Sequence, residues 1–303
     1  MRFSTLLVPV MAVGLLAACG SSTKASGPTT TAGSIGATTT VSGGPTTTAV
    51  GALPKPVVKL PATLPTTLVI TDLKQGTGTA AVNGDTVVVH YIGVRSADGQ
   101  EFDNSFDRGT PFPVTLGVGQ VIKGWDQGLV GVKAGGTRQL DIPADLAYAN
   151  TPPSSQNVIQ AGDALSFVVE VVAVIPKPNP ADAPAISIPP TPNQPTQTFT
   201  DLIVGAGPTL QPGQTVALQF LAFSAATGQQ IGSSWEQGTP MTFVPGGGQL
   251  PPGLEKAVVG MKVGGRRQVT IPFADAFGAA GNADLGLPAS TDLIMVLDLV
   301  AVY

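Results

Sequence analysis

A long internal repeat limits what this chain can fold into more than any other feature of its sequence. Adding 129 to a residue number carries Gly109-Thr110-Pro111 onto Gly238-Thr239-Pro240, and Gly135-Gly136 onto Gly264-Gly265. Further residues recur at the same offset: Gly124, Val130-Gly131, Lys133, Arg138-Gln139 and Ile142-Pro143. A constant offset over such a span indicates a tandem duplication without insertions. Because two copies are too few for a solenoid, we expect two globular domains that share a fold.

Composition agrees with two domains and excludes several classes of protein. The 303 residues exceed one ordinary domain, and a charged fraction of 11% with 38 Gly and 28 Pro is typical of a loop-rich, mainly β protein with some disordered segments. A net charge of -4 offers no basic surface for phosphates, so no nucleic-acid partner is expected. With one cysteine and one histidine, His90, we expect no metal site and no cofactor, and His90 is expected to be structural.

The N-terminus predicts export and lipidation. Arg2 precedes an apolar run that extends to Ala18, which is short for a membrane span but suits a signal peptide. The run ends in Leu16-Ala17-Ala18-Cys19, which resembles the lipobox of bacterial lipoproteins. We therefore expect a signal peptide at residues 1–18 and a lipid anchor on Cys19, which would hold the protein on the extracytoplasmic side of the bacterial cell envelope. The alternative is an ordinary signal peptide cleaved near a cysteine.

The rest of the chain divides by composition into four parts. Residues 19–61 are rich in Thr, Gly, Ser, Ala and Pro, and are predicted to form a disordered tether because they cannot bury enough apolar surface. The first domain is predicted at residues 62–176. A Pro-rich linker at residues 177–196 is expected to be semi-rigid, and the second domain follows at residues 197–303.

Within the first repeat, the pattern predicts a short helix against a sheet. Val121, Ile122, Trp125 and Leu129 recur at helical spacing and form one apolar face. Gly135-Gly136 allows a tight reversal before residues 137–142, which alternate like a half-buried strand. Further strands are predicted at residues 68–70, 86–91 and 165–175.

Five motifs of this repeat occur together in the order of a known family. They are Val89-His90-Tyr91-Ile92-Gly93, Phe102-Asp103-Asn104-Ser105, Pro111-Phe112, Gly119 through Trp125, and Ile142-Pro143 through Ala147-Tyr148. In these motifs the repeat resembles the FK506-binding-protein family of peptidyl-prolyl cis-trans isomerases. The resemblance implies an α+β fold in which each domain is a twisted antiparallel β-sheet wrapped over one short α-helix, with a hydrophobic pocket between them.

The implied activity has a simple physical basis. Rotation about an X-Pro bond meets a barrier of about 20 kcal/mol because the planar amide is stabilised by resonance, and water favours that charge-separated form. A pocket that accepts the proline ring and excludes water therefore lowers the barrier without a covalent step. The resemblance implies such an isomerase, with proline-containing exported polypeptides as substrates and an FK506-like macrolide as a ligand.

By resemblance, Trp125 forms the floor of the pocket and Asp103 lies near the amide that must twist. The Ile122 backbone N–H and the Tyr148 hydroxyl are expected to donate hydrogen bonds to substrate carbonyls, and Tyr91 completes the catalytic set. Arg108 is expected to hold Asp103, because a buried carboxylate is costly without a partner. The residues expected to bind substrate are Phe102, Arg108, Phe112, Val121, Val158, Ile159 and Phe167.

The second repeat lacks the polar groups of this pocket. Phe220, Gly232, Leu254 and Phe277 stand at the positions of Tyr91, Asp103, Trp125 and Tyr148. Pro251 replaces Ile122 and has no backbone N–H to offer. We therefore predict a weak or inactive isomerase in the second domain, used for binding or spacing. A second hypothesis is a non-catalytic extracytoplasmic binding or chaperone protein, in which both domains hold proline-containing or unfolded segments.

Overall fold

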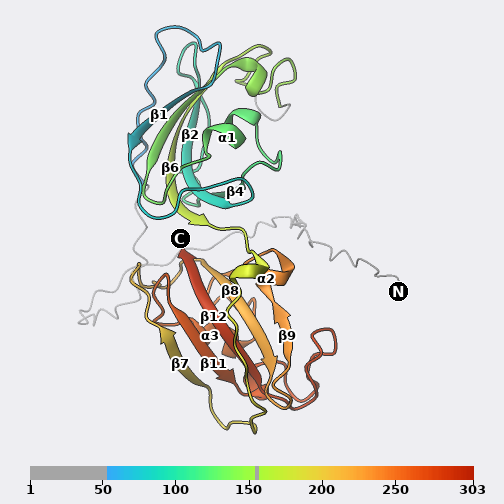
Figure 1. The fold of residues 1–303 in the computed structure, drawn as a ribbon. Helices are drawn as coiled ribbons and strands as arrows, with labels where there is room; N and C mark the ends of the chain where they lie inside the picture. Colours follow the sequence, from blue (N-terminus) through green and yellow to red (C-terminus); the bar gives the residue numbers. More distant parts are fainter. Residues whose placement is uncertain (1–52, 154–156) are drawn as a thin grey trace, which may run out of the picture. The chain divides into compact units, whose positions relative to one another are not determined.

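The computed structural model describes residues 53–153 and 157–303. The predicted signal peptide, Cys19 and residues 19–52 of the predicted tether lie outside the described residues. The described part contains two six-stranded antiparallel sheets, one from each repeat (Figure 1). In these ranges no helix combines the length and the apolar character needed to cross a membrane.

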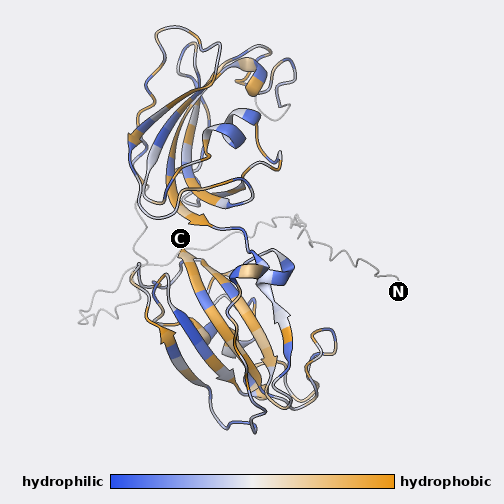
Figure 2. Cartoon of the chain, in the orientation of Figure 1, coloured by the Kyte–Doolittle hydropathy of each residue, from blue (hydrophilic) through white to orange (hydrophobic). Residues whose placement is uncertain are grey.

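The first sheet has the strand order β1-β5-β6-β2-β3, and β4 pairs with the beginning of β2. Its strands are β1 (Val69–Lys74), β2 (Thr86–Arg95), β3 (Glu101–Asn104), β4 (Phe112–Thr115), β5 (Thr137–Ile142) and β6 (Leu165–Ile175). The helical elements of this domain are α1 (Lys123–Gly128) and a 3-10 turn, η1 (Ala144–Leu146). Apolar residues are concentrated in the long central strands, as Figure 2 shows, because these strands are covered on both faces.

Two glycines let α1 approach the sheet closely. A Cβ atom on Gly124 would lie 2.4 Å from Cγ2 of Ile142, and one on Gly128 would lie 2.7 Å from Cδ2 of Leu140. Both partners are fully buried side chains of β5. The helix therefore rests directly on β5, and this contact fixes where the intervening Trp125 lies.

The second sheet repeats the connectivity of the first, with the order β10-β8-β12-β11-β7 and β9 paired with β8. Its strands are β7 (Thr198–Ile203), β8 (Val216–Ser224), β9 (Gln230–Ser233), β10 (Met241–Phe243), β11 (Arg266–Ile271) and β12 (Leu293–Val302). The helices are α2 (Ser234–Gln237) and α3 (Pro252–Ala257), with a 3-10 turn, η3 (Phe273–Asp275). The predicted α+β fold of both domains is confirmed. The one-turn α2 is an addition, and the Ser233 hydroxyl caps it by accepting from the Glu236 N–H at 3.3 Å.

Part of the predicted tether is packed on the first sheet. Val58 contacts a small apolar cluster on the outer face, formed by Ile92, Val94 and Val168. Lys55 forms ion pairs with Asp107 at 2.7 Å and with Glu101 at 3.0 Å. The boundary predicted at residue 61 therefore lies within a segment that covers this face.

The predicted linker contains the short 3-10 turn η2 (Pro180–Asp182) and packs in the same manner on the second sheet. Ile188, only 8% exposed, joins an apolar cluster with Leu221, Phe223 and Trp235. The Thr191 N–H also donates to the carbonyl of Ala225 at 2.8 Å. Each repeat thus begins with an extended segment that covers the outer face of its own sheet.

Candidate active site

The floor of the candidate site in the first domain is the indole of Trp125. This side chain is 3% exposed and is surrounded edge-on by other rings. Its ring centroid lies 5.1 Å from that of Tyr91 and 5.3 Å from that of Phe167, with interplanar angles of 90° and 85°. Phe112 lies 6.4 Å away. Such T-shaped contacts are favoured between aromatic rings, so the walls hold the indole in one orientation.

The sheet supplies the aromatic walls, and one glycine makes room for them. Tyr91 comes from β2, Phe102 from β3 and Phe167 from β6, where Gly93 pairs with Phe167. A Cβ atom on Gly93 would lie 2.6 Å from Cε1 of Phe167 and 2.7 Å from Cζ of Phe102. The bare backbone at Gly93 is therefore what allows both rings to lie over the sheet.

A polar triad stands beside the aromatic floor. The Tyr91 hydroxyl donates a short hydrogen bond to Asp103, and Arg108 donates to Asp103 at 2.5 Å and to the Tyr91 oxygen at 2.9 Å. Burial, together with the bond to Asp103, raises the pKa of Tyr91 to about 12. The bond to Asp103 also raises the pKa of Arg108. At neutral pH the phenol is thus protonated, and the carboxylate is held at a fixed place in the wall.

Three N–H or O–H groups at the site have no acceptor among the described residues. Ile122 is the N-cap of α1, and its carbonyl accepts from the Trp125 N–H at 2.9 Å, while its own N–H donates to no protein atom there. The Trp125 Nε1 is buried without a partner. The Tyr148 hydroxyl also makes no hydrogen bond, and burial raises the pKa of this phenol. The N–H of Ile122 and the O–H of Tyr148 are therefore available to a ligand.

These groups enclose a cavity of about 220 Å³. It is lined by Tyr91, Phe102, Asp103, Phe112, Gln120, Val121, Ile122, Trp125, Tyr148 and Phe167. Nine of these ten were proposed from the sequence, and Gln120 was missed. Its side-chain oxygen lies 3.4 Å from the Thr115 N–H. In the sequence, only the position of Gln120 directly before Val121 indicates that it could line the cavity.

The structure does not bring every proposed residue to the cavity. Arg108 stands beside it through its bonds to Tyr91 and Asp103. Ile159 is 4% exposed and packs in the core. Val158 does not line the cavity, and its carbonyl accepts from Arg95 at 3.1 Å. Both belong to the loop that contains residues 154–156, which lie outside the described ranges.

His90 belongs to a separate contact. Its Nδ1 lies 3.0 Å from the Ser105 hydroxyl, and its ring centroid lies 5.2 Å from that of Phe106. Burial lowers the pKa of His90. Because neighbouring residues of a strand face opposite sides, Tyr91 reaches the cavity and His90 does not.

In the second domain the equivalent place is an apolar cluster. Leu254 belongs to the buried core of the second domain, and the partly buried Phe220, Ile231 and Phe277 pack against that core. Pro251 is the N-cap of α3, so the position of the free Ile122 N–H has no donor. The hydroxyls and the carboxylate of the first pocket have no counterpart at these positions.

Both repeats match one protein-family model. A family model described as FKBP-type peptidyl-prolyl cis-trans isomerase matches residues 77–172 and 207–300, which together make up more than half of the chain. The chain belongs to this family. The two matches fall on the two repeats, so the predicted tandem of FKBP domains is confirmed, and the protein is an FKBP-type peptidyl-prolyl cis-trans isomerase.

Two sequence relatives agree with this assignment. An FK506-binding protein of Streptomyces anulatus is 48% identical over 124 residues, which are 41% of this chain and 99% of the relative. An FK506-binding protein of Neisseria meningitidis serogroup B is 46% identical over 107 residues, which are 35% of this chain and 95% of the relative. The solved structure of FkpA from Escherichia coli is 41% identical and covers 39% of this chain and 52% of its own, with a TM-score of 0.33.

Proposed function

We propose that the first domain carries the isomerase activity and that its substrates are X-Pro bonds of exported polypeptides. The observation that carries this proposal is the joint presence of a buried aromatic floor, Trp125, and a fixed carboxylate, Asp103, on one cavity. The second domain has Leu254 and Gly232 at these positions. Its contribution to catalysis is therefore expected to be small.

The cavity is suited to stabilise a twisted amide. The proline ring of the substrate would lie on the Trp125 indole, with Phe102 and Phe167 excluding water from the bond that rotates. When the amide twists, its resonance is lost and its carbonyl oxygen no longer carries the charge that water stabilises. An apolar enclosure therefore disfavours the planar ground state relative to the twisted state, without acid, base or nucleophile.

Hydrogen bonds would fix the peptide on either side of the rotating bond. The free Ile122 N–H and the Tyr148 hydroxyl are donors for two substrate carbonyls. Asp103, held by Tyr91 and Arg108, presents a carboxylate edge to the rotating amide. Because these groups are already fixed, little ordering is required when the peptide binds.

Stoichiometric inhibition tests this proposal. An FK506-type macrolide is expected to occupy the first pocket, so one equivalent per chain should remove the acceleration of cis-trans exchange in a short X-Pro peptide. Calorimetric titration of the same samples should give one site per chain. Two equal sites, or exchange that continues after the first pocket is saturated, would overturn the assignment to the first domain.

We also propose that Cys19 anchors the protein to the membrane of the bacterial cell envelope. The support is the sequence Leu16-Ala17-Ala18-Cys19 after an apolar run, since a diacylglyceryl cysteine with a further acyl chain gives stable anchoring. Expressed in a bacterium, the protein should incorporate labelled palmitate and sediment with membranes. A Cys19→Ser variant should do neither, and labelling of that variant would contradict the proposal.

A further inference from the structure

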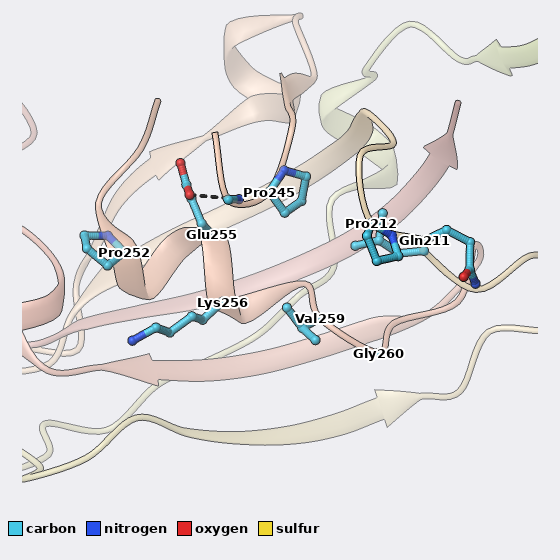
Figure 3. Close-up of a pocket in the computed structure, with 10 residues that line it drawn as sticks. Gln211, Pro212, Pro245, Pro252, Glu255, Lys256, Val259 and Gly260 are labelled. Atoms are coloured by element: carbon cyan, nitrogen blue, oxygen red, sulfur yellow. Dashed lines mark hydrogen bonds between the residues drawn. The ribbon is translucent and has the colours of Figure 1, made fainter. Parts of the chain in front are cut away.

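The second domain has a cavity that is larger than the candidate active site. This cavity does not lie at the position equivalent to the pocket of the first domain. It has a volume of about 390 Å³ and lies among the loop before β8, the turn after β10 and the helix α3 with the turn that follows it. Figure 3 shows Pro212, Pro245 and Val259, from these three segments, around the cavity. Val259 is 62% exposed. A concave, mainly apolar surface of this size is typical of a ligand site.

Comparison with the first domain explains why the cavity is open. There the equivalent of Pro245 is Leu116, which is fully buried in the core. The Leu116 N–H donates to the backbone carbonyl of Asp85 at 2.9 Å, and the Leu116 carbonyl accepts from the Gly84 N–H at 2.8 Å. These two bonds join the turn after β4 to the loop before β2. Pro245 has no N–H, so the first of these bonds cannot form in the second domain. The second bond is also missing, because no backbone hydrogen bond links Pro245 to Gly213 or Gln214, and the half-buried proline does not fill the space of the leucine.

The charges at this cavity indicate what it prefers. The buried carboxylate of Glu255 accepts from the Gly246 N–H at 2.9 Å (Figure 3). It also accepts from the Leu250 N–H at 3.1 Å, so this carboxylate stabilises the loop between β10 and α3. Lys256 is exposed and has no acidic partner within residues 53–153 and 157–303. The equivalent residue of the first domain is the neutral Gln127. The outer edge of an apolar cavity thus carries one free positive charge.

We propose that this cavity binds an extended apolar segment of an unfolded polypeptide that carries an acidic side chain next to its apolar residues. The apolar side chains would cover Pro212, Pro245 and Val259, and the acidic group would meet Lys256. The inference rests on the proposed function, because the unfolded polypeptides that present X-Pro bonds to the first domain are the source of such segments. The second domain then holds substrate at a place unrelated to its lost proline pocket.

A proline-free peptide tests this site apart from the isomerase site. The probe is a fluorescein-labelled peptide with the core Leu-Val-Leu-Asp between Gly-Ser flanks, titrated into the full chain and followed by fluorescence anisotropy. We expect saturable binding, and about tenfold or weaker affinity for a Leu-Val-Leu-Lys peptide, since the lysine would face Lys256. Absence of binding by the first peptide would overturn the inference. Exchange in a short X-Pro peptide, measured on the same sample, reports on the proposed function independently.

Two variants locate the site. Val259→Asp places a charge on the apolar surface at an exposed position and is expected to weaken binding about tenfold or more. Pro245→Leu restores the residue of the first domain and is expected to remove binding by filling the cavity. The matched control is Val130→Asp, the equivalent exposed valine of the first domain, which should bind like the parent. If Val259→Asp and Pro245→Leu both bind the peptide as tightly as the parent, and circular dichroism confirms their fold, the peptide binds elsewhere and the inference is overturned.

Discussion

At the scale of single residues, the Tyr91 hydroxyl joins the aromatic floor to the charged part of the pocket. It donates to Asp103 and accepts from Arg108, whose guanidinium also lies 5.6 Å from the centre of the Tyr91 ring. Arg108 is partly exposed, so its charge is screened by solvent and the geometry of the triad matters more than the strength of the ion pair. Loss of this one hydroxyl should therefore disturb the carboxylate while leaving the fold intact.

Tyr91→Phe is expected to reduce kcat/KM for an X-Pro peptide about two- to tenfold, the range that corresponds to the net value of one hydrogen bond. The same variant tests the raised pKa. The chain has three tyrosines, and the one at position 91 should ionise near pH 12. In a titration of phenolate absorbance, the last step of the parent should be missing from the variant. The titration curves of the parent and of Tyr91→Phe would each be divided by the number of tyrosines. If the two scaled curves are identical above pH 11, the triad does not hold the phenol in its protonated form.

The raised pKa also has a consequence for stability. Because the folded pKa lies above the ordinary value of 10.0, the folded state binds more protons than the unfolded state between pH 10 and about 12. The contribution of Tyr91 to stability is therefore fully present below pH 10 and is lost as the pH rises to about 12. Tyr91→Phe should lack this particular loss.

At the scale of elements, the pocket depends on how closely side chains can approach the backbone of β2. Gly93 lies under the rings of Phe102 and Phe167, whereas the second repeat has Ala222 at the equivalent position. There the position of Phe102 is taken by Ile231. The difference between glycine and alanine thus accompanies the presence or loss of the aromatic wall.

Gly93→Ala is expected to displace both rings, to lower the free energy of unfolding of the first domain by about 1–3 kcal/mol, and to reduce isomerase activity. Activity and denaturant unfolding of the same preparation would be measured. Ala222→Gly is the matched control: it should cost up to about 1 kcal/mol in the second domain and leave the isomerase rate unchanged. A Gly93→Ala variant with the parent's activity would show that the rings need no such space.

Sequence patterns predicted some elements better than others. The predicted strands at 137–142 and 165–175 have the bounds of β5 and β6, because the hydrophobic pattern of each ends at a turn residue. The helix begins only at Lys123, since Ile122 has an extended ψ of 147°. Val121 and Ile122 therefore line the cavity and lie outside the helix, although their spacing fits a helical face.

Other features depended on contacts that periodicity cannot reveal. The buried positions of Val58 and Ile188 arise from single apolar residues in Pro-rich segments that meet a distant sheet. Ile159 is likewise a single apolar residue of a loop that is buried in the core of the first domain. The cavity beside α3 lies at Pro245, where the first domain has the buried Leu116, and the sequence pattern alone does not reveal that the space of this leucine stays open.

At the scale of the whole molecule, the duplication has produced two domains with the same sheet connectivity and different chemistry. The first keeps an aromatic floor, a fixed carboxylate and free donors around one cavity. The second keeps the scaffold, fills that place with apolar side chains and opens another cavity. The proposed division of labour, with catalysis in the first domain and peptide binding in the second, rests on this difference between the two cavities.

The measurement that tests this account most directly is the cis-trans exchange rate of a short X-Pro peptide, followed by NMR in the presence of the full chain. Asp103→Ala combined with Trp125→Ala should remove most of the parent's acceleration. Gly232→Ala combined with Leu254→Met changes the equivalent positions of the second domain, and should leave the acceleration unchanged. If the first double variant, with its fold intact, catalyses exchange as fast as the parent, the first pocket is not the catalytic site.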